Sequence, residues 1–252
     1  MATVLVTGGA GNLGRRASWE LLRRGHTVRV LVHRSTAVVD GVDVVEGDIL
    51  RGKGISDAVA GVDAVVHAAT SRGGRSRKAE VAGARTMVQA AASVGAHLVY
   101  VSKVGVDVNR SAFYEAKWQA EGVVERSGSG WSIQRVTHFH DLIEQILSAP
   151  VLFKVPELAF QPVDVIDVAN RLADIVEAGP SGRVPDFGGP ELLGIETLAR
   201  RRRRITGRHS LLVRVPRVGR IRDYASGAHL APEHRDGTVT WEEWLKRSMN
   251  GR

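Results

Sequence analysis

The sequence predicts an α/β fold in which helices cover both faces of a doubly wound parallel sheet. Three observations support this prediction. Short runs rich in β-branched residues alternate with helix-like stretches along the first half of the chain, which is the pattern of βαβ units. These runs are almost continuously apolar, as strands buried on both faces require. A glycine-rich turn joins the first run to the first helix-like stretch, and right-handed crossovers then carry the chain to both sides of the sheet.

The predicted strands and helices follow one another in order. The runs that predict strands are 3–7, 27–32, 42–47, 63–69, 97–102 and 131–136. The stretches that predict helices are 12–24, 77–94 and 112–127. Because parallel strands need long crossover connections, a helix between most of the strands favours a parallel sheet.

After about residue 140 the alternation loosens, and prolines interrupt the apolar stretch 146–160. We therefore predict a boundary after residue 145, between a domain at 1–145 and a C-terminal region at 146–252 that partly returns to the sheet. Within that region, the amphipathic pattern of 164–179 predicts a helix. Asp167 is its expected N-cap, and Gly179 is expected to end it.

Two further helices are expected near the C-terminus. Gly207 closes the stretch "TLARRRRRITG", as a C-terminal glycine commonly does. Thr240 and Glu243 form a capping box at the start of "TWEEWLKRSM". The five arginines at 200–204 cover every side of a helix, so they indicate a solvated helix end. The other basic residues are scattered, and the net charge of +8 therefore predicts no nucleic-acid partner.

Composition narrows the class of protein. With 43% hydrophobic and 25% charged residues, it is typical of a soluble globular chain. No apolar run approaches the roughly 18 residues of a membrane span. The first strand is expected to begin at Ala2 or Thr3, which leaves no room for a signal peptide. Cysteine is absent, so a cytoplasmic protein without membrane contact is expected. The nine histidines show no ligand spacing beyond His138 and His140, so no metal site is predicted.

The stretch "VLVTGGAGNLGRR" is the most informative one. Gly8, Gly11 and Gly14 follow the first strand and open the first helix. Such glycines allow a tight turn, close approach of a pyrophosphate and tight packing of helix on strand. The free N–H groups of the helix N-terminus favour phosphate. The pattern predicts a Rossmann-type dinucleotide site, whose expected contacts are Thr7, Gly8, Gly11, Asn12, Leu13, Gly14 and Arg15.

The end of the second strand indicates which dinucleotide is bound. NAD sites usually carry an acidic residue there, which holds the ribose 2′-hydroxyl. Here the sequence reads "VLVHRST", with Arg34 at that place and no acid before Asp40. A guanidinium pairs with a 2′-phosphate, whereas a carboxylate repels it. Arg15 is placed to approach the same phosphate. We therefore predict NADP(H) as the cofactor.

These residues together resemble the short-chain dehydrogenase/reductase superfamily, in its atypical, NmrA-like branch of NAD(P)-binding proteins. The resemblance spans nearly the whole chain. It rests on "TGGAGNLG", "GDI", "VVHAAT", "VYVSKVGVD", "FYEAKWQAE" and "RVTHFHDLI", with weaker likeness in "FQPVDVIDVANRLADI", "GGPE" and "TWEEWL". It implies that the C-terminal region covers a small-molecule substrate. Under this resemblance, a homodimer is one candidate for the oligomeric state.

The resemblance also implies roles for individual residues. Asp48 and Ile49 would flank the adenine, and the small residues Ala68, Ala69 and Thr70 would lie beside the nicotinamide ribose. Lys117 would hold the hydroxyls of that ribose, and Ser102 would polarise the substrate. Two plainer interpretations stay open: Asp48 caps a turn, and Ser102 satisfies a strand end.

The catalytic acid is where the sequence departs from the family. The superfamily places a tyrosine four residues before the lysine, and here Phe113 stands there, with Tyr114 three residues before Lys117. Tyr114 emerges about 100° around the helix from Phe113, yet both spacings keep side chains adjacent. Three interpretations stay open. Tyr114 is the acid, or another group such as Ser102, His138 or His140 supplies the proton, or the chain does not catalyse a reaction.

The favoured function is an NADP(H)-dependent oxidoreductase that transfers hydride to or from a small apolar carbonyl, quinone or enone. The main alternative is a non-catalytic protein that senses NADP(H) and binds a regulatory protein partner, because Phe113 stands in place of the acid. A sugar-nucleotide epimerase or dehydratase is a further alternative, although such relatives generally keep the tyrosine at the four-residue spacing.

Overall fold

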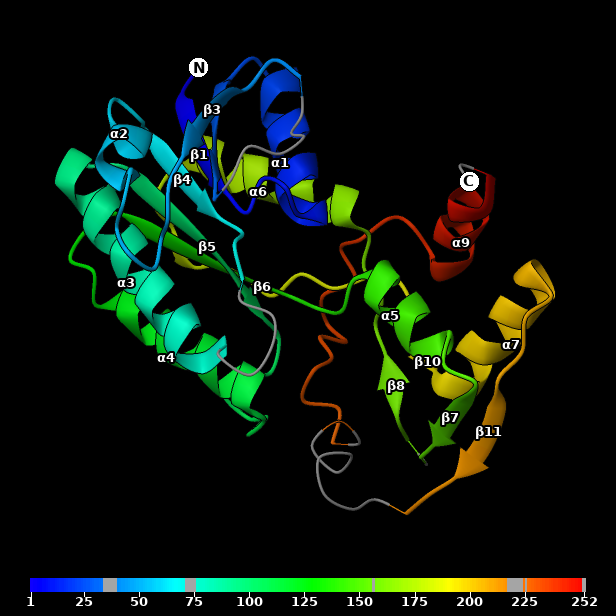
Figure 1. Ribbon diagram of the computed structural model, residues 1–252. Coiled ribbons are helices and arrows are strands. Elements are labelled where there is room, and N and C mark those ends of the chain that lie inside the picture. Colours follow the sequence, from blue (N-terminus) through cyan, green and yellow to red (C-terminus); the bar gives the residue numbers. More distant parts are fainter. Residues whose placement is uncertain (34–39, 71–75, 156, 217–223, 225, 251–252) are drawn as a thin grey trace. The chain divides into compact units, whose positions relative to one another are not determined.

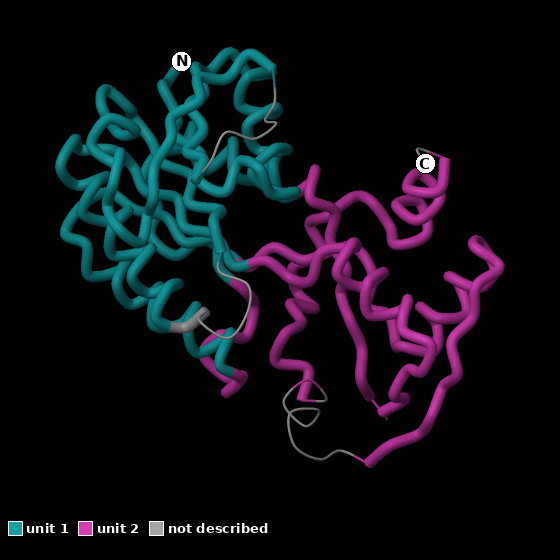
Figure 2. Tube along the Cα trace, in the orientation of Figure 1, with its two compact units in different colours: residues 1–102, 112–135, 168–185 teal, residues 103–111, 136–167, 186–252 magenta. Residues whose placement is uncertain are grey.

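The computed structural model describes residues 1–33, 40–70, 76–155, 157–216, 224 and 226–250. The chain divides into two compact units (Figure 2). Unit 1 comprises Met1–Ser102, Ala112–Arg135 and Val168–Pro185, and unit 2 comprises Lys103–Ser111, Val136–Asp167 and Asp186–Arg252. Both units are discontinuous in sequence. The segment Val168–Pro185 belongs to unit 1, although it lies within the predicted C-terminal region.

Unit 1 is built on the predicted parallel sheet. Within the described residues, seven strands form one sheet in the order β3-β2-β1-β4-β5-β6-β9. Their bounds are β1 Thr3–Thr7, β2 Thr27–Val32, β3 Asp43–Glu46, β4 Ala64–His67, β5 His97–Lys103, β6 Trp131–Val136 and β9 Gly182–Arg183. The recorded pairs run parallel; Leu5, for example, lies between Arg29 and Val65. The predicted fold class and the six predicted strands are confirmed. The strand order of the sheet reverses beside β1, and doubly wound folds bind ligands at the carboxyl ends of the strands next to such a reversal.

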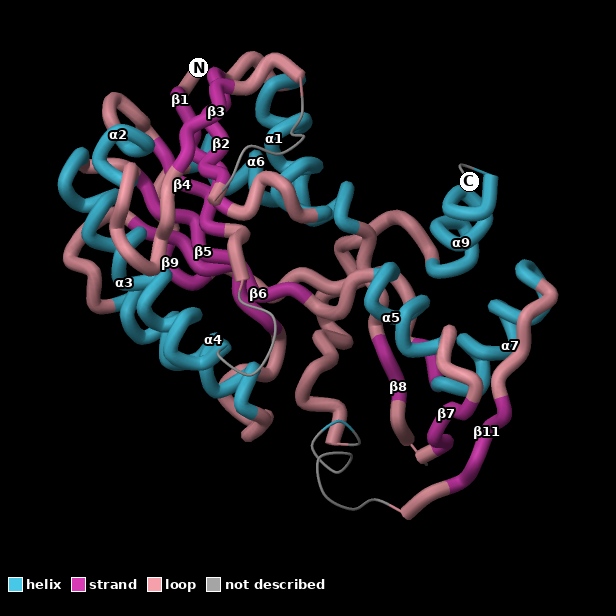
Figure 3. Tube along the Cα trace, viewed as in Figure 1, coloured by secondary structure: helices cyan, strands magenta, loops and turns pink. Residues whose placement is uncertain are grey.

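Helices cover both faces of this sheet, as Figures 1 and 3 show. Their bounds are α1 Asn12–Arg23, α2 Ile55–Val59, α3 Ser76–Val94, α4 Ala112–Glu125 and α6 Val165–Ala178. Strand residues such as Leu5, Val65 and Leu98 pack into one core with α2, α3 and α4. On the other face, Arg24 after α1 pairs with Asp174 of α6 at 2.7 Å. The sheet is therefore doubly wound, as predicted.

Within its described residues, unit 2 contains helices and two small sheets. The helices are α5 His140–Leu147, α7 Ile195–Thr206 and α9 Trp241–Asn250. The small sheets pair β7 Val151–Lys154 with β11 Leu211–Arg214 in parallel, and β8 Ala159–Phe160 with β10 Leu193–Gly194 antiparallel. Leu147, Leu198 and Trp241 are fully buried in its core. No helix in the described part of the chain is both long and apolar enough to cross a membrane.

The arginine run at 200–204 corrects one expectation. Arg202 is only 4% exposed, and its Nε donates to Glu144 of α5 at 2.9 Å. Arg201 pairs with Glu191, and Arg204 pairs with Glu242. The solvated helix end predicted for this run is therefore wrong for Arg202, because burial of the guanidinium is compensated by a carboxylate from a neighbouring helix.

The helix caps follow the sequence except in one case. Asp164, and not Asp167, accepts the Ile166 N–H at 2.8 Å at the start of α6. The Asp167 carboxylate lies one turn later and accepts the Thr238 N–H at 2.8 Å instead. The capping box of α9 is confirmed, and so is the end of α7, where Gly207 has a left-handed φ of 71°.

Candidate functional site

The turn after β1 has the close contacts that its glycines suggest. Gly8 has a φ of 72°, and its carbonyl accepts the Gly11 N–H at 2.8 Å. A Cβ on Gly14 would lie 2.2 Å from that same carbonyl oxygen. A Cβ on Gly8 would lie 2.8 Å from the backbone of Ala69, which follows β4. The turn therefore has no room for side chains at Gly8 and Gly14, as a backbone cradle for phosphate requires.

The N-terminus of α1 suits an anion. Gly11 is its N-cap and supplies no side-chain hydrogen bond, and no acidic residue lies in the first turn. The first N–H groups of a helix have no partner within that helix, and the helix dipole adds partial positive charge there. Asn12 and Arg15 are exposed, whereas Leu13 is buried against the unit. The predicted phosphate contact fits this geometry and stays a prediction.

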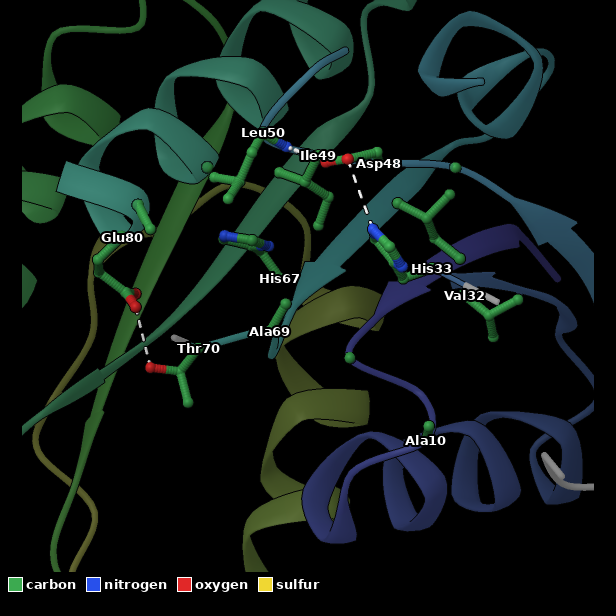
Figure 4. Close-up of a pocket in the computed structure, with 15 residues that line it drawn as sticks. Ala10, Val32, His33, Asp48, Ile49, Leu50, His67, Ala69, Thr70 and Glu80 are labelled. Atoms are coloured by element: carbon green, nitrogen blue, oxygen red, sulfur yellow. Dashed lines mark hydrogen bonds and ion pairs between the residues drawn. The ribbon is translucent and has the colours of Figure 1, made fainter. Parts of the chain in front are cut away.

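A cavity of about 580 Å³ lies beside this turn, entirely within unit 1 (Figure 4). Its walls come from the ends of β1, β2 and β4, the segment after β3, and α3. The predicted site residues among its lining are Gly8, Asp48, Ile49, Ala69 and Thr70. Lining residues that the sequence reasoning did not single out include His33, Leu50, His67 and Glu80.

Asp48 occupies one end of the cavity. Its Oδ1 accepts the N–H groups of Leu50 at 2.9 Å and Arg51 at 3.2 Å. Its Oδ2 lies 3.5 Å from Nε2 of His33. Desolvation opposes ionisation, but the backbone N–H groups and the nearby positive charges lower the pKa of Asp48. Asp48 thus does cap a turn, and its second oxygen faces His33 as an acceptor at the cavity wall.

Glu80 connects the opposite end of the cavity to α4. It is 5% exposed on α3, and its carboxylate accepts hydrogen bonds from the hydroxyls of Thr70 and Tyr100, each at 2.9 Å. Nζ of Lys117 lies 2.7 Å from the same carboxylate. Burial opposes ionisation, but the ammonium of Lys117 holds the pKa of Glu80 well below its usual range. The site therefore contains a buried carboxylate–ammonium pair that the sequence reasoning missed.

A sequence signal for Glu80 did exist. Ala84, Met87 and Ala91 lie four, seven and eleven residues after it, which is the spacing of one helix face. All three are fully buried. A single carboxylate on an apolar helix stripe must find a partner, because unpaired buried charges are costly. The partner, Lys117, lies on another helix, and its position required the structure.

Lys117 is fixed from three sides. Besides Glu80, its ammonium donates to the Val101 carbonyl at 2.9 Å and lies 4.7 Å from the centre of the Tyr100 ring. It is 5% exposed. A lysine ammonium has three hydrogen-bond donors, so a ribose hydroxyl would use the third donor or share one of these contacts. Its predicted role as a ribose anchor stays a prediction.

His67 lies between the glycine turn and Glu80. Its Nδ1 is 2.7 Å from Oγ1 of Thr7, which also accepts the Ala69 N–H at 3.3 Å. Burial, and next the charge of Lys117, lower the pKa of His67 to about 4. The imidazole is therefore neutral at physiological pH. It fixes the side chain of Thr7, whose predicted cofactor contact would be made beside this bond.

Ser102 and Tyr114 are both buried in unit 1. Ser102 is 2% exposed at the end of β5, and its Oγ has no hydrogen-bond partner among the described residues. Tyr114 is 1% exposed and lies with Lys117 on the buried face of α4, whereas Phe113 is 37% exposed. The rings of Phe113 and Tyr114 meet edge to face, with centres 5.9 Å apart. The three-residue spacing therefore keeps Tyr114 and Lys117 on one buried face of α4.

The remaining predicted residues lie elsewhere. Arg34 falls outside the described residues. Ala68 is half-buried between His67 and Ala69. His138 and His140 belong to unit 2, and burial lowers the pKa of each. Nε2 of His140 lies 3.1 Å from the Val239 carbonyl oxygen, so this histidine has a structural partner. In the described ranges, no group of three or more acidic or histidine side chains is arranged to hold a metal.

The chain is similar to known proteins in sequence and in fold. The model of a family described as NAD(P)H-binding matches residues 8–178. A chloroplastic divinyl chlorophyllide a 8-vinyl-reductase from Oryza sativa subsp. indica is 30% identical over 220 residues. That match covers 75% of this chain and 54% of the relative, so the chain spans about half the length of that relative.

Solved structures share the fold. A short-chain dehydrogenase/reductase superfamily protein from Agrobacterium tumefaciens, solved with NAD, matches with a TM-score of 0.77 at 22% identity. The match covers 99% of this chain and 97% of that one. An NADPH-dependent quinone oxidoreductase from Escherichia coli matches with a TM-score of 0.78 at 17% identity, over 98% of this chain and 100% of that one. At such identities the likeness establishes the fold alone.

Proposed function

The chain belongs to the NAD(P)H-binding family, and from this premise, together with its resemblance to the atypical, NmrA-like short-chain dehydrogenase/reductases, we propose that it is an NADP(H)-dependent oxidoreductase. Its reaction would transfer hydride to or from a small apolar carbonyl, quinone or enone. The observation that carries the proposal is the cavity of about 580 Å³ in unit 1. One of its sides is the glycine turn at the N-terminus of α1, and another includes Glu80, which pairs with the buried Lys117.

The residues around the cavity fit a dinucleotide. A Cβ at Gly8 or Gly14 of the glycine turn would collide with backbone atoms, and the N-terminus of α1, a favourable place for phosphate, begins beside the turn. Asp48 supplies an acceptor at the end expected for adenine, with Ile49 as an apolar neighbour. Ala69 and Thr70 are the small residues expected at the ribose. NADPH supplies the hydride when it is bound.

The chain's own side chains supply binding and proton transfer. In this proposal, Lys117 binds the ribose and its positive charge favours the phenolate of Tyr114, which lies on the same face of α4. Tyr114 donates a proton to the substrate oxygen. Ser102 donates a hydrogen bond to that oxygen, and this bond would satisfy a hydroxyl that is otherwise buried without a partner among the described residues.

The activity test is NADPH oxidation with a panel of apolar aldehydes, ketones, quinones and enones. We expect turnover with at least one member, and we expect Tyr114→Phe to lower turnover about a hundredfold or more while NADPH still binds. Phe113→Leu is the matched control, because it removes the neighbouring exposed ring without adding a hydroxyl and should leave turnover intact. Tight NADPH binding with no oxidation across the panel would reject the enzyme.

A second function is supported by two observations. Phe113 stands four residues before Lys117, and Glu80 already satisfies the ammonium of Lys117. A protein that senses NADP(H) and reports its state to a protein partner would need the cofactor site without the acid. Affinity capture with and without NADPH separates this function from catalysis, because a sensor would retain different partners in the two conditions.

A further inference from the structure

Unit 2 contains a cavity of its own, of about 480 Å³. This volume falls within the range of about 300–1,000 Å³ that is common for small-molecule sites. Its walls include residues of α5, β7 and β8 and the first residue of α7. These elements, labelled in Figure 1, belong to unit 2, which Figure 2 shows in magenta. The cavity is therefore defined without reference to unit 1.

The cavity has a buried floor and an open rim. Leu152, Phe160 and Ile195 contribute to the floor, and each is only 5% exposed. At the rim, Leu142 and Ile146 are 38% and 36% exposed and lie one turn apart on α5. Their neighbours on the same helix, Ile143 and Leu147, are fully buried in the core of unit 2. At the rim of the cavity, α5 thus exposes apolar side chains that are not part of the core of unit 2.

The lining carries no formal charge among the described residues. Its one buried ionisable side chain is His138, which is 3% exposed and meets the ring of Phe160 edge to face at 5.8 Å. Burial, and next the charge of Lys103, hold the pKa of His138 well below its usual value. A charged ligand would lose its hydration here with no opposite charge to replace it.

We propose that this cavity binds a neutral, largely apolar small molecule. The proposal extends the function above without depending on it, since an enzyme and a sensor could each use such a site. A small molecule suits the cavity better than a second copy of the chain. A protein partner needs a broad surface, of about 800 Å² per partner, whereas here the apolar side chains converge on a concave floor.

The test uses the full chain without cofactor and three probes that share one alkyl chain: methyl octanoate, octanoate and octylammonium. Titration calorimetry should show saturable binding of the neutral ester, with affinity at least about tenfold above that of either ion. Equal affinity for octanoate, or no saturable binding of the ester, would overturn the proposal.

Variants at the rim locate the binding. Ile146→Glu puts a charge at the rim and Ile146→Trp fills the cavity, so each should weaken ester binding about tenfold or more. Gln145→Glu is the matched control, since Gln145 is exposed on the same helix and does not line the cavity. An unchanged free energy of unfolding in urea would show that all three variants remain folded. An apolar docking face would behave differently, because Ile146→Trp would strengthen self-association in light scattering; that result would also overturn the proposal.

The outcome is separable from that of the proposed function. Failure of NADPH oxidation with retained ester binding rejects the enzyme and keeps this site. Oxidation of NADPH without ester binding in unit 2 keeps the enzyme and rejects this site.

Discussion

At the scale of single residues, Glu80 determines the electrostatics of the candidate site. It is a buried carboxylate whose charge is balanced by Lys117 at 2.7 Å. Replacing one member of a buried pair leaves the other charge without compensation, which costs about 3–5 kcal/mol. We therefore expect Glu80→Gln to lower the free energy of unfolding in urea by about 3 kcal/mol.

The matched control for Glu80→Gln is Glu196→Gln, which breaks the exposed pair with Lys154. An exposed pair contributes at most about 1 kcal/mol, so this variant should stay close to the wild type. The double variant Glu80→Gln with Lys117→Met removes both charges and should recover most of the loss. If Glu196→Gln costs as much as Glu80→Gln, burial is not what makes the pair important.

The same pair gives stability a defined pH dependence. The pKa of Glu80 is lower in the folded state than in the unfolded state. Its contribution is therefore fully present above the unfolded value of about 4.3 and is lost as the pH falls through the folded value. Between neutral pH and acid, the wild type should lose more stability than Glu80→Gln. Parallel curves for the two proteins would contradict this assignment.

Replacing Ser102 should lower turnover without lowering the free energy of unfolding. Its buried Oγ has no partner among the described residues, so Ser102→Ala removes a desolvated hydroxyl without breaking a hydrogen bond. We expect its free energy of unfolding to stay within about 0.5 kcal/mol of the wild type, and its turnover to fall about a hundredfold because a donor to the substrate oxygen is lost.

Ser132 is the matched control for Ser102. Its buried Oγ lies 2.8 Å from Nε2 of His97 and accepts the Ser181 N–H at 3.0 Å. Ser132→Ala should therefore lower the free energy of unfolding by about 1–3 kcal/mol and leave turnover unchanged. The assignment of Ser102 fails if its alanine variant is destabilised in the same way and remains fully active.

At the scale of elements, α1 is tied to the glycine turn by Gly14. A Cβ there would lie 2.2 Å from the Gly8 carbonyl oxygen, so Gly14→Ala must push α1 away from the turn. We expect NADPH affinity to fall about a hundredfold, because the N–H groups at the helix start would no longer face the phosphates.

Gly122 is the control for Gly14, since both are helical glycines of unit 1. A Cβ on Gly122 would meet only the end of the flexible Arg126 side chain, at 3.1 Å. Gly122→Ala should keep NADPH affinity and stabilise the chain by up to about 1 kcal/mol, since alanine is the better helix former. Equal losses of affinity in the two variants would show that the effect is not local to the turn.

Elements with a strong local pattern were predictable from the sequence. The capping box of α9 is one example, because a helix of ordinary amphipathic pattern follows Thr240 directly. At the start of α6, Asp164 and Asp167 are both candidates for the N-cap. We predicted Asp167, but its carboxylate instead accepts a hydrogen bond from Thr238, some seventy residues away. Non-local partners of this kind leave no trace in local sequence.

At the scale of the whole molecule, the same distinction explains which parts of the fold were predictable. The sheet of unit 1 follows from alternating strands and helices. In unit 2, β7 pairs with β11 although they are sixty residues apart, and β8 and β10 are two residues each. Such short strands have no periodicity to recognise. The site shows the same limit, since the glycine turn is local in sequence, whereas the contact of Glu80 with Lys117 joins two helices.

Net charge is also a property of the whole molecule, and it complicates the choice between NADP and NAD. A chain with a net charge of +8 attracts any anionic nucleotide. This general attraction is screened over about 10 Å at 0.1 M salt. A direct guanidinium–phosphate pair is shorter in range and should persist as the salt concentration rises.

The cofactor preference is therefore best measured as ligand-induced stabilisation at low and high salt. A ligand that binds only the folded state raises the free energy of unfolding by an amount that grows with its affinity. We expect NADPH to stabilise the wild type more than NADH by about 1.4 kcal/mol or more, the equivalent of tenfold affinity, at both salt concentrations.

Arg34→Ala should remove most of that difference and Arg15→Ala part of it. Arg16→Ala, an exposed neighbour of Arg15, should preserve it. If the difference disappears at high salt in the wild type, general charge explains it and the arginines do not read the 2′-phosphate.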